Sequence, residues 1–519
     1  MYSQAVTVEE MTAIDVNSEY LGASRLVLME NAGAEVARAI REKMEVKNKK
    51  VVVVSHLGNK GGDGFVTARH LAILGADVTV VLIGDPLKIR SAEARKNWSI
   101  LKEMESSVKI IVIKDSSKLH LLEEVLKNAN LVVDALLGTG VKGELRPPIS
   151  NIVKLINEAR KTGAFTVAID LPTGIHPNTG EVLGVAVEAH LTVTHHKPKI
   201  GLLSEKSRKY VGELRVANIG IPPEAELFAG PGDVLIALKE RKPTAHKGDF
   251  GRIVIIGGSK DYSGAPALAG LAALRAGADL SIIIAPKAIS TSIRSYSPNL
   301  IVREYEGDYL NSSGVELALK EGKRANALII GPGLSINEQV EDAVHKILEE
   351  FKKLNIPVVV DADAIKACAT KIDSLHNLKG VITPHVGEFK TLTQIQLPPE
   401  DKGGWKNRID IVRREAEKLK TTILLKAHYD IISNGVKVKV NRTGNPGMTV
   451  GGTGDVLAGL TAAFLAWNTT PMRAATAAAF INGLAGDLAV NEKGYHILAS
   501  DVIEKIPDAF AKVKEYITK

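Results

Sequence analysis

Three aspartates in the sequence stand at positions where a carboxylate could move a proton. Asp134 lies in the apolar run NLVVDALLG and Asp170 in FTVAIDLP, whereas Asp455 follows the glycine-rich stretch TVGGTG. Ligands bind at the carboxyl ends of parallel strands, so Asp134 and Asp170 are candidate bases or cation ligands. Asp455 would lie beside free backbone amides that bind an anion, as a base for a hydroxyl that attacks a phosphoryl group. For each aspartate taken alone, capping of a helix is the alternative.

Two glycine-rich segments of the first half precede or surround candidate site residues. LGNKGGDGF (57–65) follows an apolar run and precedes a helical pattern, and GTGVKGELRPP (138–148) follows Asp134. Glycine lets a backbone approach a ligand closely, and a helix N-terminus offers free amides to a phosphate. The first segment is neither the spaced dinucleotide fingerprint nor a Walker loop, and a tight turn is its alternative interpretation. Together with the loop after Asp170, these segments predict one site at one edge of a sheet.

Short β-branched runs alternate with amphipathic stretches along the chain, which predicts parallel sheets covered by helices on both faces. Before the first run, two helical patterns are separated by Gly22. The segment 218–233 is rich in Pro and Gly and is predicted to be a linker. We therefore predict an α/β protein of two domains, residues 1–225 and 226–519. The predicted strands are 50–56, 77–84, 109–114, 130–138, 165–172 and 191–196, then 252–259, 280–286, 327–333, 356–365, 380–388 and 421–435.

The composition is that of a folded globular protein. The 519 residues are 45% hydrophobic and 24% charged, which argues against disorder. The formal net charge is +7, and no block of Lys and Arg is interleaved with aromatics, which argues against nucleic acid and suits an anionic substrate. No apolar run reaches the length of about 20 residues that spans a membrane, and the first residues do not form a signal peptide. Cys368 is the one cysteine, so no internal disulfide can form and a cytoplasmic location is predicted.

Four segments of the first domain together resemble the epimerase domain of the NAD(P)H-hydrate repair enzymes. They are LMENAG (28–33), GNKGGDG (58–64), VVDALLGTGVKGELRPP (132–148) and DLPTGIHPNTG (170–180). The resemblance implies a Rossmann-like three-layer domain that interconverts the R and S hydrates at C6 of the nicotinamide ring. It implies Asp170 as the catalytic group, with Lys142 as its helper or as a phosphate contact. The implied substrate contacts are Asn59, Lys60, Gly61, Gly62, Asp63, Gly138, Thr139, Gly140, Val141, Lys142, Gly143, Glu144 and Asp170.

One position departs from the pattern of that family. The second Asn of the family's glycine-rich segment lies at a bound potassium ion, and Lys60 stands at this position here. Asp134 and Thr173 match the other potassium ligands of the family. A lysine ammonium is a compact positive charge on a flexible stem, so Lys60 could occupy the cation site itself. The alternative is that Lys60 points to solvent or to a substrate phosphate.

The glycine-rich segment before Asp455 resembles the ribokinase-like superfamily, and three further segments narrow the resemblance. GPGL (331–334), DADAI (361–365) and TPHVGE (383–388), taken with it, resemble the ADP-dependent NAD(P)H-hydrate dehydratase. This implies that the S hydrate and ADP give NAD(P)H, AMP and phosphate, with Asp455 as the base and with Mg²⁺ ordered by Glu388 through water. The implied substrate contacts are Ala265, Gly333, His385 and Asp455, and the implied nucleotide contacts are Lys426, Ala427, His428, Tyr429, Asp430 and Gly454.

Other interpretations remain open at this point. A ribokinase-like kinase of a small vitamin precursor would share the segment before Asp455, and its first domain would be a non-catalytic nucleotide-binding module. KAHYD (426–430) departs from the family's commoner Lys-Gly-Ala/Ser run, so the choice between ADP and ATP is open, as is that between NADH and NADPH hydrates. The predicted partners are the small molecules NADHX, NADPHX and ADP, not a nucleic acid or a membrane. The sequence leaves the formation of a homo-oligomer undecided.

Overall fold

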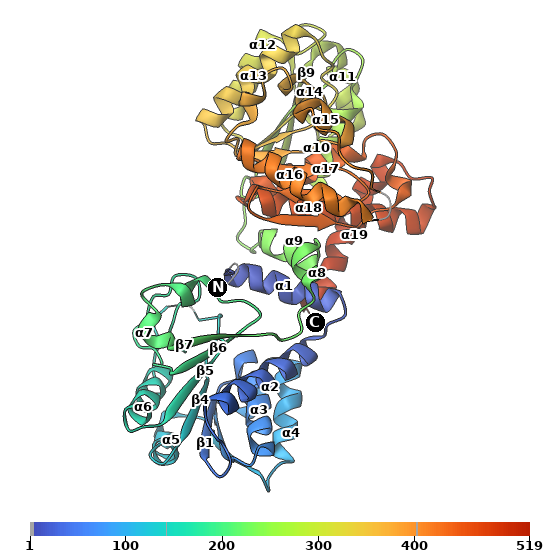
Figure 1. The fold of residues 1–519 in the computed structure, drawn as a ribbon. Helices are drawn as coiled ribbons and strands as arrows, with labels where there is room; N and C mark the ends of the chain where they lie inside the picture. The colour runs from blue at the N-terminus through green and yellow to red at the C-terminus, as the bar shows by residue number, and fades with distance from the viewer. Residues whose placement is uncertain (1–4, 142, 401–402, 519) are drawn as a thin grey trace. The chain divides into compact units, whose positions relative to one another are not determined.

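The computed structural model describes residues 5–141, 143–400 and 403–518. In it the chain divides into two compact units, Met1–Pro222 and Pro223–Lys519. Each unit is built on its own, mainly parallel β-sheet with helices packed on the faces of that sheet (Figure 1). The predicted α/β class is confirmed.

The sheet of the first unit contains seven parallel strands within the described residues. Their order is β3 (Val108–Ile113), β2 (Asp77–Ile83), β1 (Lys50–Ser55), β4 (Leu131–Ala135), β5 (Phe165–Ile169), β6 (Leu191–His195) and β7 (Glu213–Ala217). The central strands are valine- and isoleucine-rich and buried along almost their whole length, as a sheet covered on both faces requires. Because β1, β4 and β5 are neighbours, the three segments that follow them meet at one edge of the sheet, as predicted.

Helices cover both faces of this first sheet (Figure 1). Val52 and Val54 of β1 belong to an apolar core with α5 and α6, whereas Val53 faces α3, because successive side chains of a strand point to opposite faces. The predicted break between the first two helices is confirmed at Gly22. The helices are α1 (Val8–Tyr20), α2 (Arg25–Lys43), α3 (Asn59–Ile73), α4 (Ala92–Lys102), α5 (Leu119–Leu126), α6 (Ile149–Lys161) and α7 (Arg208–Val211).

The glycine-rich segment 57–65 differs from the loop that we expected, because α3 already begins at Asn59. A Cβ atom on Gly61 would lie 1.9 Å from the carbonyl oxygen of His56, and one on Gly64 would lie 2.5 Å from Cβ of Ala135. These glycines therefore let the first turns of the helix lie directly against the end of the sheet. Their helix propensity is lower than that of alanine by about 1 kcal/mol each, so close packing and not helix formation explains them.

The sheet of the second unit contains nine strands within the described residues. Their order is β10 (Ile301–Tyr305), β9 (Leu280–Pro286), β8 (Arg252–Ile256), β11 (Ala327–Ile330), β12 (Val358–Val360), β13 (Gly380–Ile382), β14 (Thr422–Leu425), β15 (Asp430–Ser433) and β16 (Val438–Asn441). The pairing is parallel from β10 to β14 and antiparallel from β14 to β16. The run 421–435, predicted as one strand, forms two strands because the chain reverses at the polar residues between Leu425 and Asp430.

Helices also cover both faces of the second sheet (Figure 1). On one face α10 packs closely on α17, where a Cβ atom on Gly459 would lie 2.2 Å from the carbonyl oxygen of Ala269. On the other face α12 and α13 close a large apolar core with the strands. The helices are α10 (Gly264–Ala276), α11 (Lys287–Tyr296), α12 (Ser312–Gly322), α13 (Glu338–Lys353), α14 (Asp363–Cys368), α15 (Val386–Thr393), α16 (Trp405–Leu419), α17 (Thr453–Ala466), α18 (Pro471–Lys493) and α19 (Ala499–Thr518).

The segment 218–233, predicted to be a linker, is partly helical. It contains α8 (Pro223–Leu227) and the start of α9 (Pro231–Ala237). Proline suits the first turn of a helix because its missing N–H would have no partner there, and the Asp233 carboxylate accepts a hydrogen bond from the amide of Gly230 at 3.0 Å. The proline and glycine content that predicted a linker therefore accompanies the starts of two short helices.

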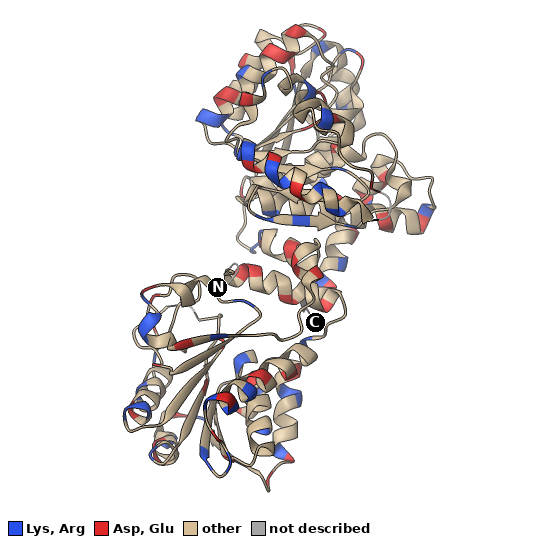
Figure 2. Ribbon diagram, viewed as in Figure 1, with Lys and Arg blue, Asp and Glu red and all other residues tan. Residues whose placement is uncertain are grey.

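Charged side chains lie mainly on the helices and loops of each unit. Figure 2 shows Lys and Arg interspersed with Asp and Glu over the helices of both units, whereas the strands are mostly tan. None of the described helices is long and apolar enough to cross a membrane.

Candidate active sites

The first candidate site lies at the carboxyl ends of β1, β4 and β5. α3 begins shortly after β1, the segment 136–144 follows β4, and Asp170 is the first residue after β5. The predicted epimerase residues come from these three segments, although the structure does not bring all of them into contact. Lys142, the predicted helper of Asp170, lies outside the described residues.

The ammonium group of Lys60 is enclosed by four oxygen atoms. Its Nζ atom donates to Asp134 Oδ2 at 3.0 Å and to Thr173 Oγ1 at 3.2 Å. It also donates to the carbonyl oxygens of Leu137 and Leu171, at 3.2 and 2.7 Å. The Lys60 side chain is 5% exposed and that of Asp134 is 0% exposed, so this lysine does not point to solvent. Three N–H donors are shared by four oxygens, so the group acts on the surrounding segments much as a spherical ion would.

Asp134 joins the segments around that ammonium group. Its Oδ1 atom accepts from the amide of Leu136 at 3.1 Å and from Thr173 Oγ1 at 2.7 Å. Its Oδ2 atom accepts from the amide of Thr173 at 2.7 Å, in addition to Lys60. Burial lowers the pKa of Lys60, and the carboxylate of Asp134 opposes this effect. Removal of one partner would leave a buried unpaired charge, which costs about 3–5 kcal/mol.

Asp170 leaves the sheet through a left-handed turn with a φ of 61°. Such a backbone is uncommon for a residue with a side chain, and it is often kept at functional turns. Its Oδ1 atom accepts hydrogen bonds from Lys199 Nζ, from Thr194 Oγ1 at 3.1 Å and from the amide of His195 at 3.3 Å. Burial raises the pKa of Asp170, but the Lys199 ammonium outweighs it and holds that pKa well below its ordinary value. Asp170 is therefore ionised at neutral pH, as a general base must be.

Sequence reasoning missed Lys199 and Asp15, which belong to this site. Burial raises the pKa of Asp15 to about 6, and the nearby charges of Lys199 and Asp170 also act on it. Burial likewise raises the pKa of Asp63 well above its ordinary value, and the negative charge of Asp170 adds to the effect. A single lysine and a helical aspartate carry no motif. The signal that could have found Lys199 is its position just after β6, the strand next to β5.

Asn59, the first residue of α3, is exposed, and the remaining predicted substrate residues of the first unit fall into two groups. Gly61 and Gly62 are buried against neighbouring residues and act in packing. The described residues of the segment 138–144 are half-buried to exposed, and a Cβ atom on Gly140 or Gly143 would meet nothing within 4 Å. This segment therefore has room for a ligand, and it contains Gly138, Thr139, Gly140, Val141, Gly143 and Glu144 among the described residues.

The second candidate site lies at the carboxyl ends of β11 to β14. Gly452, with a φ of 98°, precedes α17, and Asp455 lies in the first turn of that helix. The amides of the first turn of a helix have no partner within the helix, so this end binds anions. A Cβ atom on Gly454 would lie 3.4 Å from Nζ of Lys426, which places that ammonium beside the helix N-terminus. The predicted contacts Gly454, Asp455 and Lys426 are thus brought together.

Lys426 is surrounded by carboxylates. Its Nζ atom donates to Asp361 Oδ1 at 2.8 Å and lies 4.0 Å from Glu388 Oε2. Asp361 is buried and also accepts from Thr383 Oγ1 at 2.7 Å. Burial lowers the pKa of Lys426, but the two carboxylates raise it above its ordinary value. Asp361 was not among the predicted site residues, although DADAI contains it.

Asp455 has an acidity suited to a base at neutral pH. Burial raises its pKa to about 7, and the negative charge of Asp361 adds to this, while Lys426 opposes it. A carboxylate with a pKa near the working pH combines a sizeable ionised fraction with a strong affinity for the proton. Beside an anion-binding helix end, it can take the proton of a hydroxyl that attacks phosphorus.

His385 and Glu388 cap the start of α15. His385 Nδ1 accepts from the amides of Gly387 at 2.9 Å and Glu388 at 3.2 Å, and Glu388 Oε2 accepts from the amide of His385 at 2.9 Å. The His385 side chain remains 57% exposed. Among the described residues no group of three His, Cys, Asp or Glu side chains could hold a metal ion. Glu388 nevertheless suits Mg²⁺ in its usual form, in which few carboxylates act together with substrate phosphates and water.

The conformation of the predicted nucleotide segment 426–430 is held by contacts within the segment and with neighbouring residues of the protein. Asp430 Oδ1 accepts from the amide of Ala427 at 3.1 Å, and Asp430 Oδ2 accepts from Asn441 at 3.0 Å. The ring of Tyr429 stacks on Trp405 with 5.0 Å between centroids, and His428 is exposed. Asp430 and Tyr429 thus hold the turn, while Lys426 faces α17.

Two further predicted contacts lie side by side. A Cβ atom on Gly333 would lie 3.5 Å from Cβ of Ala265 and 2.9 Å from Cβ of Tyr262. Gly333 has a φ of 67°, so a side chain there would be strained as well as crowded. Tyr262, which is 57% exposed, is a neighbour that sequence reasoning missed.

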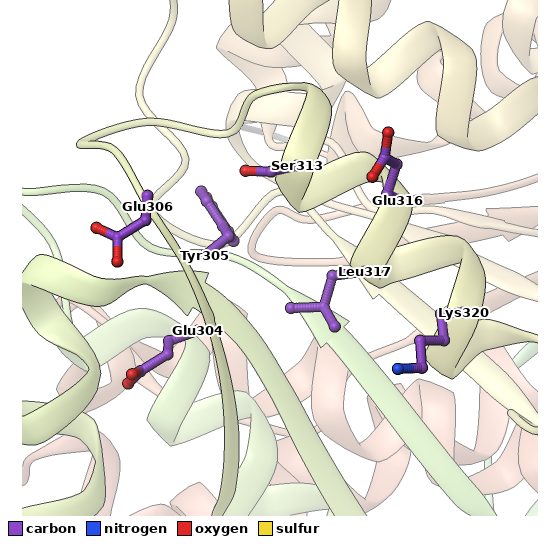
Figure 3. Close-up of a pocket in the computed structure, with 7 residues that line it drawn as sticks. All are labelled: Glu304, Tyr305, Glu306, Ser313, Glu316, Leu317 and Lys320. Carbon is purple, nitrogen blue, oxygen red and sulfur yellow. The ribbon is translucent and has the colours of Figure 1, made fainter.

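A separate hollow of about 530 Å³ lies between the end of β10 and α12 (Figure 3). Three glutamates line it, and two of them are already paired, Glu304 with Arg294 and Glu306 with Lys287. β9, β8 and β11 separate β10 from β12, so the hollow is not part of the cluster around Lys426. We assign neither the substrate nor the nucleotide to it.

Two α/β units, each with buried ionisable groups at the carboxyl edge of a parallel sheet, define an enzyme with two sites. Residues 253–508 match the family model described as NAD(P)H-hydrate dehydratase, and residues 25–201 match that of the YjeF-related protein N-terminus. The bifunctional NAD(P)H-hydrate repair enzyme Nnr of Pyrobaculum aerophilum is 45% identical over 97% of both chains. That of Methanothermobacter thermautotrophicus is 41% identical over 96% of this chain and 94% of its own.

The chain belongs to the family of bifunctional NAD(P)H-hydrate repair enzymes, which confirms the resemblance seen in the sequence. Among solved structures, the ADP/ATP-dependent NAD(P)H-hydrate dehydratase of Bacillus subtilis, crystallised with ATP and Mg²⁺, is 28% identical. It covers 55% of this chain and 98% of its own, with a TM-score of 0.47.

Proposed function

We propose that this protein repairs hydrated nicotinamide cofactors with one reaction in each unit. The first unit interconverts the R and S hydrates of NAD(P)H, and the second converts the S hydrate and ADP into NAD(P)H, AMP and phosphate. The observation that carries the second reaction is the position of Asp455 in the first turn of α17, next to Lys426. The single cysteine and the small-molecule substrates suit a cytoplasmic enzyme.

Dehydration becomes easy when the poor leaving group at C6 is first phosphorylated. Asp455 accepts the proton of the C6 hydroxyl while the hydroxyl oxygen attacks the β-phosphorus of ADP, and AMP leaves. The C6–O bond then breaks with its electron pair on phosphate, the ring nitrogen supplies electrons to C6, and a proton passes from C5 to water. Hydroxyl and proton are lost from neighbouring carbons, which restores the C5=C6 double bond.

Lys426 and the amides before Asp455 are proposed to bind the phosphates of ADP. The positive charge of this ammonium group stabilises the transition state most strongly, because negative charge develops there on the transferred phosphoryl group. Ala265, Gly333 and His385 are proposed to contact the hydrate, and Ala427, His428, Tyr429 and Asp430 to form the nucleotide edge. Bound through water to Glu388, Mg²⁺ would neutralise phosphate charge.

Recovery of nicotinamide absorbance tests this proposal. Pure S hydrate and pure R hydrate are each incubated with the protein, Mg²⁺ and either ADP or ATP. We expect immediate recovery from the S hydrate with ADP, and recovery from the R hydrate that requires the epimerase site. A stable phosphorylated product without recovered absorbance would instead indicate a kinase of a small vitamin precursor.

In the first unit we propose that Asp170 exchanges a proton with the hydrate and that Lys60 is an internal cation. The four oxygens around Lys60 support this, since they leave no donor set for potassium while the ammonium is bound. The segments 59–63 and 138–144, with Lys142 among them, are proposed to hold the substrate.

The potassium requirement of the epimerase tests the role of Lys60. We expect the native rate to be unchanged between potassium-free buffer and high potassium. Lys60→Ala should lose activity and regain part of it when potassium or ammonium is added, because the added cation can then bind the four oxygens that surround the Lys60 ammonium group in the native protein. Lys206→Ala, which removes an exposed ion pair, is the control. Full potassium dependence of the native enzyme would contradict the proposal.

A further inference from the structure

The two oxygens of the Asp170 carboxylate have different surroundings. Oδ1 accepts three hydrogen bonds, from Lys199 Nζ, Thr194 Oγ1 and the amide of His195. Among the described residues no hydrogen-bond donor reaches Oδ2. One oxygen is therefore held by the protein and the other is left for a ligand. A base that must meet a substrate in one orientation needs this asymmetry.

Lys199 is itself held firmly. Its side chain is 2% exposed, and its Nζ atom also lies 3.3 Å from Thr194 Oγ1 and 3.4 Å from the carbonyl oxygen of His195. The backbone around it is tied to Val6, which donates to the carbonyl of Pro198 at 2.9 Å and accepts from the amide of Ile200 at 3.1 Å. A buried lysine that is anchored on both sides cannot follow Asp170 if it moves, so the ion pair fixes the carboxylate.

The charges around Asp170 show why a cation is needed there. Asp15 of α1 and Asp63 of α3 act on this site as further carboxyl groups. Lys60 reaches the site, but its ammonium group is already paired with Asp134. Burial lowers the pKa of His195 to about 4, so this neighbour is neutral at physiological pH. Lys199 is the cation in direct contact with Asp170 among the described residues.

We propose that Lys199 is the positioning residue of the epimerase, which holds Oδ1 of Asp170 as an anion and presents Oδ2 to the substrate. Oδ2 then takes the proton of the C6 hydroxyl while the bond between C6 and the ring nitrogen breaks with its electron pair on nitrogen, which leaves an open-chain aldehyde. The nitrogen attacks the other face of this aldehyde to re-form the bond, and Oδ2 returns the proton to the C6 oxygen, so no proton is gained or lost overall. This inference rests on the proposed epimerase function. It differs from the role of Lys60, which holds Asp134 and the neighbouring segments and does not contact Asp170.

The pH profile of epimerisation in Lys199→Gln tests this role. Glutamine is nearly as long and can still donate a hydrogen bond to Oδ1, but it carries no charge. Without nucleotide no dehydration occurs, so the two hydrates can be separated by chromatography and the rate corrected for spontaneous epimerisation. The acid limb of the profile should move upward by about 1–3 pH units, because the opposite charge that favours ionised Asp170 is gone. At low pH this is a loss on the order of 10- to 1000-fold, with recovery toward the native rate at high pH.

Several controls separate the possible outcomes. Lys199→Arg keeps the charge and should keep the acid limb in place, and Lys206→Gln, on the surface of the same unit, should behave as the native protein. A loss in Lys199→Gln that is equal at every pH would show a purely structural role and overturn the inference, as would an unchanged profile. Hydrogen exchange of the first unit checks that the variant is folded, and if it is not, Thr194→Val, which removes one neutral donor to Oδ1, should give a smaller shift of the same sign. A native protein that does not epimerise the hydrates would overturn the proposed function itself.

Discussion

Asp170 and Asp455 are both half-buried beside a lysine, yet their acidities differ. Lys199 donates directly to Asp170, so the ion pair outweighs burial and lowers the pKa of the carboxyl. Lys426 donates to Asp361 instead, so burial dominates at Asp455 and raises its pKa to about 7. A nearby lysine is therefore not enough to keep an aspartate ionised. The carboxylate to which the lysine donates its hydrogen bond decides the protonation of the aspartate.

The base assigned to the dehydratase can be tested by its ionisation. Asp455 acts only when ionised, so the dehydration rate should rise with pH through about 7. Asp455→Asn should lower the rate about 100- to 10,000-fold and remove this dependence, because the amide cannot accept the proton. Absorbance recovery from the S hydrate with ADP between pH 5.5 and about 8.5 measures both effects. An asparagine variant with the native pH profile would refute the assignment, and unchanged epimerisation is its control.

Asp63 should make the stability of the first unit fall as pH rises, whereas a carboxylate in an ion pair makes stability rise with pH. Burial raises its pKa in the folded state above that of the unfolded chain, so the folded state binds more protons. The stability of the first unit is then greatest below the unfolded pKa and falls as pH rises through the folded one. Asp63→Asn should reduce this fall, as followed by hydrogen exchange of the amides of α3 at several pH values. Equal pH dependence in the native protein and the variant would contradict the expectation.

At the scale of elements, the start of α3 is where packing overrides helix propensity. Three glycines follow Asn59 within two turns, and the absent side chains of Gly61 and Gly64 let the helix meet the ends of β1 and β4. The sequence pattern indicated a ligand loop because glycine is permissive in both settings. Only the distances between the helix and the strands distinguish a ligand-binding loop from a closely packed helix, and these distances are known only from the tertiary structure.

Gly61→Ala tests the packing role of these glycines. The added Cβ would lie 1.9 Å from a backbone oxygen, which cannot move as a flexible side chain can, so the first unit should lose about 1–3 kcal/mol of stability or more. Gly140→Ala is the matched control for stability, since its Cβ would meet nothing within 4 Å. Denaturation monitored on the first unit compares the two. A Gly61 variant as stable as the Gly140 variant would show that the helix can shift away.

At the scale of the whole molecule, the two reactions should be separable in one chain. With ADP and Mg²⁺, Asp170→Asn should convert the S hydrate at the native rate and leave the R hydrate, apart from spontaneous epimerisation. Asp455→Asn should equilibrate the two hydrates without restoring absorbance. A mixture of R and S hydrates, followed by chromatography, measures both variants. Loss of S-hydrate conversion in Asp170→Asn would show that the sites depend on each other.

Much of this organisation could be predicted from the sequence. The alternation of apolar runs and helical patterns indicated two parallel α/β units, because buried parallel strands need continuous apolar residues. The strand-end positions of Asp134 and Asp170 followed from the same runs, and the glycines before Asp455 indicated a helix end that binds anions. These features are local, so the order of residue types determines them.

The tertiary structure alone decided which charges meet. Lys60 reaches Asp134 across 74 residues, and Lys199 reaches Asp170 across 29, so neither pair appears as a motif. The sequence placed Lys60 at a cation position but left the direction of its side chain open. Apart from its position shortly after a predicted strand, nothing distinguished Lys199 among the 66 Lys and Arg residues. Which ammonium group lies within hydrogen-bond distance of which carboxylate depends on the packing of neighbouring strands and helices. Burial then makes each such contact strong enough to set the ionisation of the site.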